Sequence, residues 1–468
     1  MRRALQAHQK ALDVTGHNIA NAATPGYVRQ QAMLEVTRPY TPPGVVRLVR
    51  PGQIGTGVEA TRVRRIFDGF IEGRIRLANS ALGYWDEKKA ALEQVEAAFN
   101  DPSDIGFGDS LSRFWNAWQE LSKRPESDAV RAVLIEEAGS FCAILNRTAT
   151  QLETTQQELE AAFRAKVTEA NSLAHEVAEL NEEITKIKVT GNEPNDLMDK
   201  RDAAIRRLSE LMDVSVYEDR DGALTIEVGG EFLVRRDTVH ELDIQAFGPV
   251  NSVVVWAHNR EAVAITGGEI AGVREARDIL VPKYYDKLNE IARTVIDKVN
   301  ELHKTGYGID ELNTHDIDFF VGNIPGSEAR HIAVNPVLVA DPRKIGAARP
   351  LVPGDPVAPG DGTVAGEIAA LKDKLLMESG RLTIGGFYSE TIVLLGNDSE
   401  TAERMAEVEE LTLHQNTSRK ESFSGVSVDE ELANVMRYQH AYNACARMVS
   451  VIDEMLDVLI NRTGVTGL

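Results

Sequence analysis

Residues that could support catalysis or bind a metal are few in this 468-residue chain, and their spacing matches no known site. His8 and His17 lie near the start, but the sequence has no His-Glu-x-x-His pattern, which places two zinc ligands on one helical face. The segment Gly106-Phe107-Gly108 lacks the third glycine and the preceding strand of a dinucleotide-binding loop. No nucleophile, base and orienting group can be combined, so we expect no enzymatic activity and no cofactor.

One acidic segment has the residue types that a cation prefers. It contains Asp310, Glu311, His315, Asp316 and Asp318. The spacing of a calcium loop, with its central glycine and terminal glutamate, is missing. The sequence therefore favours a solvated loop and predicts no metal site.

Charge and composition exclude further classes of function. The formal net charge is -21, from 51 basic and 72 acidic residues, whereas binding to nucleic acid requires a concentrated basic face. No apolar run has membrane-spanning length, and no apolar signal-peptide core follows Met1. We therefore expect neither nucleic acid nor membrane as a partner. The one basic cluster is interpreted as a solvated or interfacial face and contains Arg47, Arg50, Arg62, Arg64 and Arg65.

The elements that dominate the chain are helices at its two ends. The first carries apolar residues at seven-residue spacing (Leu5, Leu12 and Ile19) and should end at Thr24-Pro25-Gly26, because proline has no N–H to donate. The last should begin after Ser427, a good N-cap residue. Its apolar seam contains Leu432, Val435, Gln439, Tyr442, Ala446, Val449, Ile452, Leu456 and Leu459.

Between these ends the periodicity predicts long helices and one β insert. Helices are expected over residues 73–100, 110–121, 129–188, 195–212, 279–303, 364–379 and 383–413. The helix at 129–188 would be about 90 Å long and must pack lengthwise on other long helices. Strands are expected at 45–49 and 58–63 in an extended arm, at 214–217, 224–228, 232–234, 253–256 and 263–265 in the insert, and at 331–334.

These patterns predict a mainly α fold with a small inserted β domain. Helices before and after the insert should share one long antiparallel bundle or coiled coil, with both chain ends at the same pole and an extended N-terminal arm. The expected divisions are an assembly helix and arm (1–65), the first part of the bundle (66–212), the β domain (213–268), a helical return (269–310), an irregular bridge (311–362), the last part of the bundle (363–424) and a C-terminal assembly helix (425–468).

Three short motifs near the start resemble those of the flagellar axial proteins, which are the rod, hook and hook-associated subunits. They are Ala11-Leu12-Asp13-Val14, Asn18-Ile19-Ala20-Asn21 and Thr24-Pro25-Gly26-Tyr27, followed by Arg29-Gln30. Family members carry further residues before these motifs. Residues 426–459, the stretch 195–202, and Gly267 to Gly272 with Arg277-Asp278 are similar to the hook-associated members in particular.

The resemblance implies a structural subunit that joins hook to filament, lies outside the cell in the flagellum and is exported without a cleaved signal. Its partners would be further copies of itself, the hook subunit, the next hook-associated protein, an export chaperone and the export apparatus. The terminal helices are expected to be mobile in the monomer and to order on assembly. The chaperone would hold Val449, Ile452 and Leu456. Assembly would use Leu5, Leu12, Asn18, Ile19, Asn21, Pro25, Gly26, Tyr27, Leu432, Val435, Gln439, Tyr442, Val449, Ile452, Leu456 and Leu459.

Two alternatives remain open at this point. One is a different axial component, such as a rod subunit, a hook subunit or the third hook-associated protein. The other belongs to a different class: a cytosolic helical scaffold, or an enzyme whose site lies in the β insert.

Overall fold

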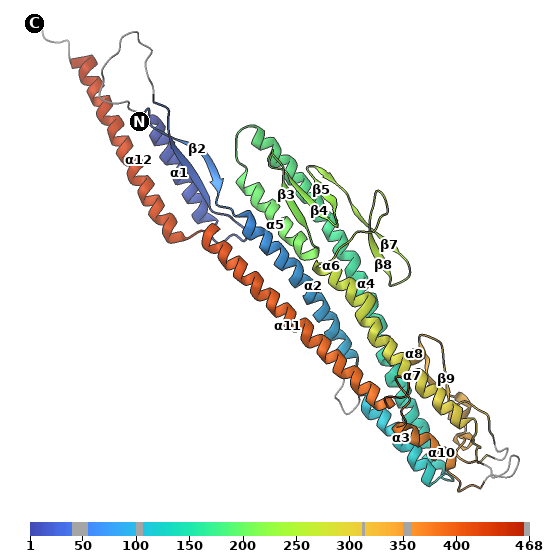
Figure 1. The fold of residues 1–468 in the computed structure, drawn as a ribbon. Coiled ribbons are helices and arrows are strands. Elements are labelled where there is room, and N and C mark those ends of the chain that lie inside the picture. The colour runs from blue at the N-terminus through green and yellow to red at the C-terminus, as the bar shows by residue number, and fades with distance from the viewer. Residues whose placement is uncertain (40–54, 100–105, 311–313, 350–357, 463–468) are drawn as a thin grey trace, which may run out of the picture.

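Long helices give the molecule the shape of a rod, with the first and the last helix of the described residues at one end (Figure 1). The computed structural model describes residues 1–39, 55–99, 106–310, 314–349 and 358–462. The predicted strand at 45–49, together with Arg47, Arg50 and Glu311, lies outside the described residues. Among the helices of the described ranges, none combines the length and the apolar character needed to cross a bilayer.

The two ends of the chain form a small unit of their own, which we call the terminal module. It contains α1 (Arg2–Ala20), α12 (Val428–Asp457) with the π turn η4 (Val458–Arg462), and an antiparallel pair of strands, β1 (Gln30–Val36) and β2 (Val58–Arg65). Helix α1 packs against both α12 and the strand pair. The prediction that the two ends meet at one pole is confirmed, and the predicted strand at 58–63 lies within β2.

The bundle connects this module to the far end of the rod. It is built from α2 (Gly69–Phe99), α4 (Asp128–Val189), α5 (Asn195–Leu211), α6 (Gly268–Glu275), the π turn η1 (Ala276–Leu280), α7 (Val281–His303) and α11 (Ile384–Ser424). Helix α4 has 62 residues, which corresponds to about 93 Å at 1.5 Å per residue. Helices before and after the β insert pack together, α2 with α11 and α4 with α6, as predicted.

An aromatic core closes the far end of the rod. Helix α3 (Phe107–Lys123) places Phe114 and Trp118, both fully buried, against Phe141 of α4 and against Phe319. The surrounding short elements are β9 (Phe320–Val321), α8 (Glu328–His331), β10 (Ala333–Val334), α9 (Pro336–Ala340), η2 (Pro342–Lys344), α10 (Thr363–Ala369) and η3 (Ala370–Asp373).

The β domain lies on the side of the bundle and packs on α4 (Figure 1). One antiparallel sheet has the order β3 (Ser215–Glu218), β4 (Leu224–Val228), β5 (Glu231–Arg235), β6 (Thr238–Val239), and a separate hairpin pairs β7 (Leu242–Ala246) with β8 (Ser252–Trp256). The turn at Asp221-Gly222 joins β3 to β4, and Gly222 has a φ of +85° that suits glycine.

Several predicted boundaries are wrong for identifiable reasons. Residues 263–265 form no strand: Ala262 makes one isolated bridge to Val255, and the chain then turns into α6. The helix predicted at 279–303 begins already at Gly268, because a π turn carries it past Pro282, which lacks the N–H of a regular turn.

Two further predicted elements are shorter than expected. The helix predicted at 364–379 stops at Asp373, since Lys374 is already extended, and the φ values of +46° and +56° at Glu378 and Ser379 are also incompatible with a helix. The strand predicted at 331–334 is reduced to β10, since His331 belongs to α8.

Candidate assembly interface

Small residues on α1 allow the terminal helices to approach each other closely. The buried residues of α1 are Ala7, Ala11, Val14, Thr15 and Asn18, which follow helical spacing. Together with Ala32 of β1, two of them form a hydrophobic cluster that Tyr438 of α12 and Val63 of β2 cover. This cluster is separate from the main core. The terminal module is therefore a unit with its own small core.

The predicted seven-residue stripe of α1 is not the face that the chain itself buries. Leu5, Leu12 and Ile19 are each half-buried, beside the small-residue face. They remain partly open to a neighbour in a way that Ala7 and Ala11 do not.

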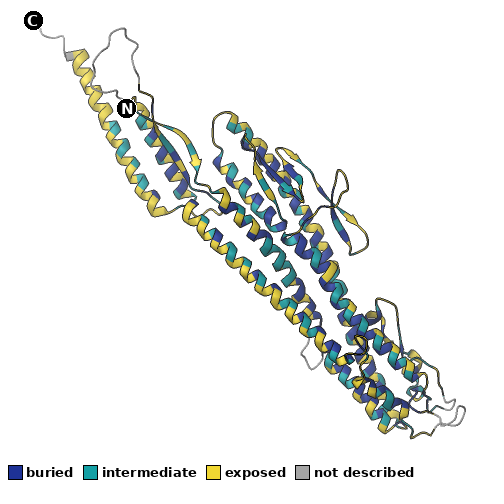
Figure 2. Ribbon diagram, in the orientation of Figure 1, coloured by how far each residue is buried: buried dark blue, intermediate teal, exposed yellow. Residues whose placement is uncertain are grey.

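Helix α12 is exposed along most of its length (Figure 2). Glu431 is its one buried residue among those described, and the predicted seam is only half-covered at Val435 and Tyr442, while Gln439 is exposed. Twelve large apolar residues of α12 and η4 are 39% to 75% exposed to solvent. We call this set the α12 apolar surface. It consists of Val428, Leu432, Met436, Met448, Val449, Val451, Ile452, Met455, Leu456, Val458, Leu459 and Ile460.

Exposed large apolar side chains in this number on one helix are characteristic of an interaction site. Fully burying an exposed side chain of this type contributes on the order of 1.5–3 kcal/mol, and because these are already partly covered, each would contribute roughly half of that. The described part of the chain supplies no element that covers the surface beyond α1, so a large favourable free energy is available to a second molecule.

Asn18 is the centre of a buried polar network inside the terminal module. It is 1% exposed, and its amide nitrogen donates to the carbonyl oxygen of Gln30 (2.8 Å) and to Glu431 Oε2 (3.1 Å). Its amide oxygen accepts from the Tyr27 hydroxyl (2.8 Å) and from the Gln30 N–H (3.0 Å). All of the side chain's main bonding capacity is thus used to hold α1, β1 and α12 together.

Arg29 completes the network on the α12 side. Its guanidinium contacts Glu431 Oε1 through Nε (2.8 Å) and through a terminal nitrogen (2.7 Å), and it reaches Glu430 at 3.0 Å. Glu431 is only 3% exposed, so this ion pair, in which two guanidinium nitrogens contact one carboxylate oxygen, neutralises a buried charge. The predicted N-cap is confirmed: Ser427 Oγ accepts from the Glu430 N–H at 3.4 Å.

A second set of polar contacts fixes the terminal module to the bundle at the start of α5. The Val28 N–H donates to Asp199, the Gln30 side chain donates to Asp196 and accepts from Asn195, and Arg65 contacts Asp199 at 2.6 Å. Arg65 also contacts Asp202 at 2.7 Å. Motifs from residues 18–30 and 195–202 are therefore parts of one joint.

The electrostatics of this joint follow from burial among carboxylates. Burial, with the nearby charges of Asp196, Asp199 and Glu431, raises the pKa of Tyr27 far above its ordinary value, so its hydroxyl stays protonated. Burial also raises the pKa of Asp199, against the opposing effect of Arg65. For Arg65 burial lowers the pKa, but the neighbouring Asp202 and Asp199 outweigh it and the net pKa is raised.

The turn after α1 directs the following residues, Val28 to Gln30, toward the start of α5. Helix α1 ends at Ala20, and the half-buried Asn21 donates to the His17 carbonyl at 3.0 Å. Pro25 is exposed, while Gly26 has a φ of +82° and a Cβ there would lie 3.1 Å from the Arg206 guanidinium. Glycine is thus required by its backbone conformation, while the flexible Arg206 side chain could move aside.

The other interior motif, Gly267 to Gly272 with Arg277-Asp278, has its contacts within the bundle and the β domain. Arg277 is fully buried, pairs with Glu160 and donates to the Ser252 carbonyl at 2.6 Å, which links η1, α4 and β8. A Cβ at Gly272 would lie 2.5 Å from the Tyr84 carbonyl oxygen, so this glycine permits the close packing of α6 on α2.

Side chains that the sequence offered as candidates for metal binding make contacts within the protein. Asp310 accepts from Thr314, and Asp318 pairs with Lys304 at 2.9 Å, so these carboxylates of the acidic segment have protein partners. Cys142 is buried, and burial raises the pKa of its thiol to about 12, as expected of a small hydrophobic residue. Cys445 of α12 is only half-buried.

Comparisons with known proteins agree with these features. Family models match the helical domain of flagellar hook-associated protein FlgK over residues 92–320, the C-terminal region of flagellar basal body rod FlgEFG proteins over 421–462, and flagella basal body rod protein over 2–27. The last two ranges are those of α12 and α1.

Relatives of known identity align with this chain over nearly its whole length. Flagellar hook-associated protein 1 of Bacillus subtilis is 31% identical across 100% of this chain and 98% of its own length, and that of Salmonella typhimurium is 22% identical across 98% of each. The structure of the flagellar hook junction protein FlgK from Burkholderia pseudomallei superposes with a TM-score of 0.63 at 13% identity, covering 75% of this chain and all of that one, which establishes the shared fold. Because the identity to the Bacillus protein extends from end to end, this chain belongs to the family of flagellar hook-associated protein 1 (FlgK).

Proposed function

We propose that this protein forms the junction between hook and filament and polymerises through α1 and α12. The observation that carries the proposal is the α12 apolar surface, whose large side chains are 39% to 75% exposed although they lie on a regular helix beside α1. A helix with such a surface gains stability only when another molecule covers it.

Assembly would be heterologous, with one patch of the terminal module contacting a different patch on the next copy. Contacts of that type repeat into a ring or helix rather than closing into a dimer. The half-buried Leu5, Leu12 and Ile19 on α1 and the exposed Leu432 on α12 supply two such patches. The bundle would form the next layer, and the β domain would face outward.

The polar contacts within the terminal module, and those between it and the start of α5, would fix the orientation of the terminal helices relative to the bundle. Asn18 and Glu431 hold the two terminal helices together, and the contacts of Arg65 with Asp199 and Asp202 transmit their orientation to the bundle. A subunit placed between two different lattices requires a fixed angle between its inner and outer parts. We assign the hook subunit and the next hook-associated protein as its axial neighbours.

Before assembly the α12 apolar surface requires protection. Val449, Ile452 and Leu456 are 39%, 42% and 47% exposed and follow the spacing of a helix that docks into a groove. We assign this segment to an export chaperone, with delivery through the export apparatus to the outside of the cell without cleavage of a signal. No catalytic role is part of this proposal.

Deletion of the gene tests the proposed position of the protein at the junction between hook and filament. We expect cells with hooks but no filaments, with filament protein released into the medium, and restoration by the wild-type gene. Absence of hooks would instead indicate a rod or hook subunit. Normal swimming would contradict an axial role and favour a cytosolic scaffold.

A further inference from the structure

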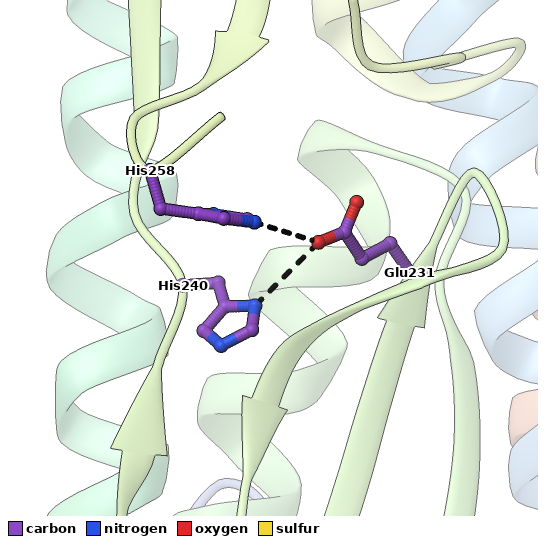
Figure 3. Close-up of side chains that lie close together, drawn as sticks. All are labelled: Glu231, His240 and His258. Atoms are coloured by element: carbon purple, nitrogen blue, oxygen red, sulfur yellow. Dashed lines mark ion pairs between the residues drawn. The ribbon is translucent and has the colours of Figure 1, made fainter. Parts of the chain in front are cut away.

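Three potential metal ligands meet in the β domain, away from the terminal module (Figure 3). They are Glu231, His240 and His258, whose ligand atoms all lie within 4.8 Å of one another. Among the described residues this is the one group of three or more histidine, cysteine or carboxylate side chains with such a spacing.

The geometry is close to that of a four-coordinate metal site. Glu231 Oε1 lies 3.7 Å from His240 Nδ1 and 3.0 Å from His258 Nε2. In a tetrahedral zinc site the metal–ligand bonds are about 2.0–2.2 Å, which places neighbouring ligand atoms about 3.3 Å apart. Figure 3 shows both imidazole rings directed at the same carboxylate oxygen.

The backbone holds each ligand in place from a different part of the domain. Glu231 begins β5 directly after the turn at Gly229-Gly230, where both residues have positive φ. The His240 N–H donates to the Leu233 carbonyl at 2.9 Å, which ties the residue after β6 to β5. His258 lies in the turn after β8.

One observation separates these residues from an ordinary surface cluster. His240 Nδ1 is buried yet has no hydrogen-bond partner within the described part of the chain. A buried imidazole nitrogen without a hydrogen bond costs free energy, and coordination of a cation would compensate for it. The side chains of His258 and Glu231 are 44% and 31% exposed, so an ion can enter from solvent.

We propose that Glu231, His240 and His258 bind one divalent transition-metal ion of the zinc type. Imidazole nitrogen and carboxylate oxygen are ligands that such ions favour, and water would occupy the fourth position. The ion would connect the four-stranded sheet, through Glu231, to the β7–β8 hairpin, through His258. It therefore acts as a clamp between the two sheets of the β domain.

The test is zinc binding by the untagged, full-length protein after treatment with a chelator. Isothermal titration and elemental analysis should give one zinc ion per wild-type chain, and zinc should raise the midpoint of thermal unfolding. His258→Ala and Glu231→Gln should each lose this uptake and this shift. Addition of Co²⁺ to the wild type should give the visible absorption of a four-coordinate site, and His258→Ala should not.

Two variants serve as matched controls. His175 of α4 pairs with Glu241 at 2.8 Å, and neither belongs to the three-residue group, so His175→Ala should bind zinc like the wild type. Cys445→Ser excludes the half-buried thiol as the ligand. The proposal is overturned if the wild type takes up no more zinc than the His240→Ala/His258→Ala double variant, whether because neither binds zinc or because both do.

Discussion

Replacing Arg29 by methionine should loosen α12 from the rest of the chain. The change removes the cation that neutralises Glu431, whose side chain is 3% exposed, and keeps most of the aliphatic volume. Breaking a buried ion pair by removing one partner costs about 3–5 kcal/mol. The Arg29 side chain is 21% exposed, so water can partly replace it and we take the lower value, about 3 kcal/mol. That corresponds to about a 100-fold increase in local opening of α12.

Hydrogen exchange measured by mass spectrometry on the dilute monomer reads out this opening. Arg29→Met should accelerate exchange in the first four turns of α12 and leave α4 unchanged. The double variant Arg29→Met/Glu431→Met should recover much of the protection, because no buried charge remains. Glu430→Gln is the matched control: Glu430 contacts the same guanidinium but is 64% exposed, so its loss should change exchange less than threefold. Equal, small effects of Arg29→Met and Glu430→Gln would refute the reasoning.

Three further outcomes are expected. In the dilute monomer, amides within residues 449–460 should exchange faster than those within 431–446, because the contacts of Glu431 and Tyr438 with α1 lie in the latter stretch; uniform protection of both terminal helices would contradict this. The double change Val449→Asp/Ile452→Asp should abolish capture by the export chaperone, with Val393→Asp at a 63% exposed position of α11 as the control; unchanged capture would rule out the proposed contact. Burial lowers the pKa of His303 to about 4 from 6.5, so below pH 6.5 the unfolded chain binds a proton that the folded chain does not, and stability falls by about 1.4 kcal/mol per pH unit down to pH 4. His303→Asn should therefore reduce the loss of unfolding free energy between pH 6.5 and pH 5 by about 2 kcal/mol in denaturant titrations; an identical pH dependence would contradict this.

The long helices could be predicted because their signal repeats many times. The apolar residues of α4 recur at spacings of three and four over 62 residues, and its observed bounds differ from the predicted ones by one residue at each end. The start of α6 could not be predicted in the same way. Gly267-Gly268 reads as the end of a segment, whereas Gly268 begins the helix that packs closely on the backbone at Leu211.

The polar contacts that hold the terminal module together and fix it to α5 could be predicted only in part from the sequence. The motifs around Asn18 and Tyr27 drew attention through their resemblance to flagellar axial proteins, but their partners carry no local signal. Arg29 and Glu431 are 402 residues apart, and Arg65 and Asp199 are 134 apart. Single charged residues have no periodicity, so only the folded chain shows which of them meet.

The sequence did not show which face of α1 the chain itself buries. Leu5, Leu12 and Ile19 at seven-residue spacing were assigned to assembly, and the chain buries Ala7 and Ala11 beside them. Alanines let the helices approach closely and leave the larger side chains at the edge, where a neighbouring subunit can reach them.

The most direct test of the central claim is incorporation of an α12 variant into purified hook–filament junctions. Leu432→Asp/Met436→Asp alters two side chains that are 48% and 58% exposed and lie outside the segment assigned to the chaperone, so folding and export should continue. We predict that this variant accumulates in the medium and is absent from junctions. Phe247→Asp, at a 66% exposed position of the β domain, should be incorporated normally. Incorporation of Leu432→Asp/Met436→Asp at the wild-type level would contradict the assignment of α12 as the assembly surface.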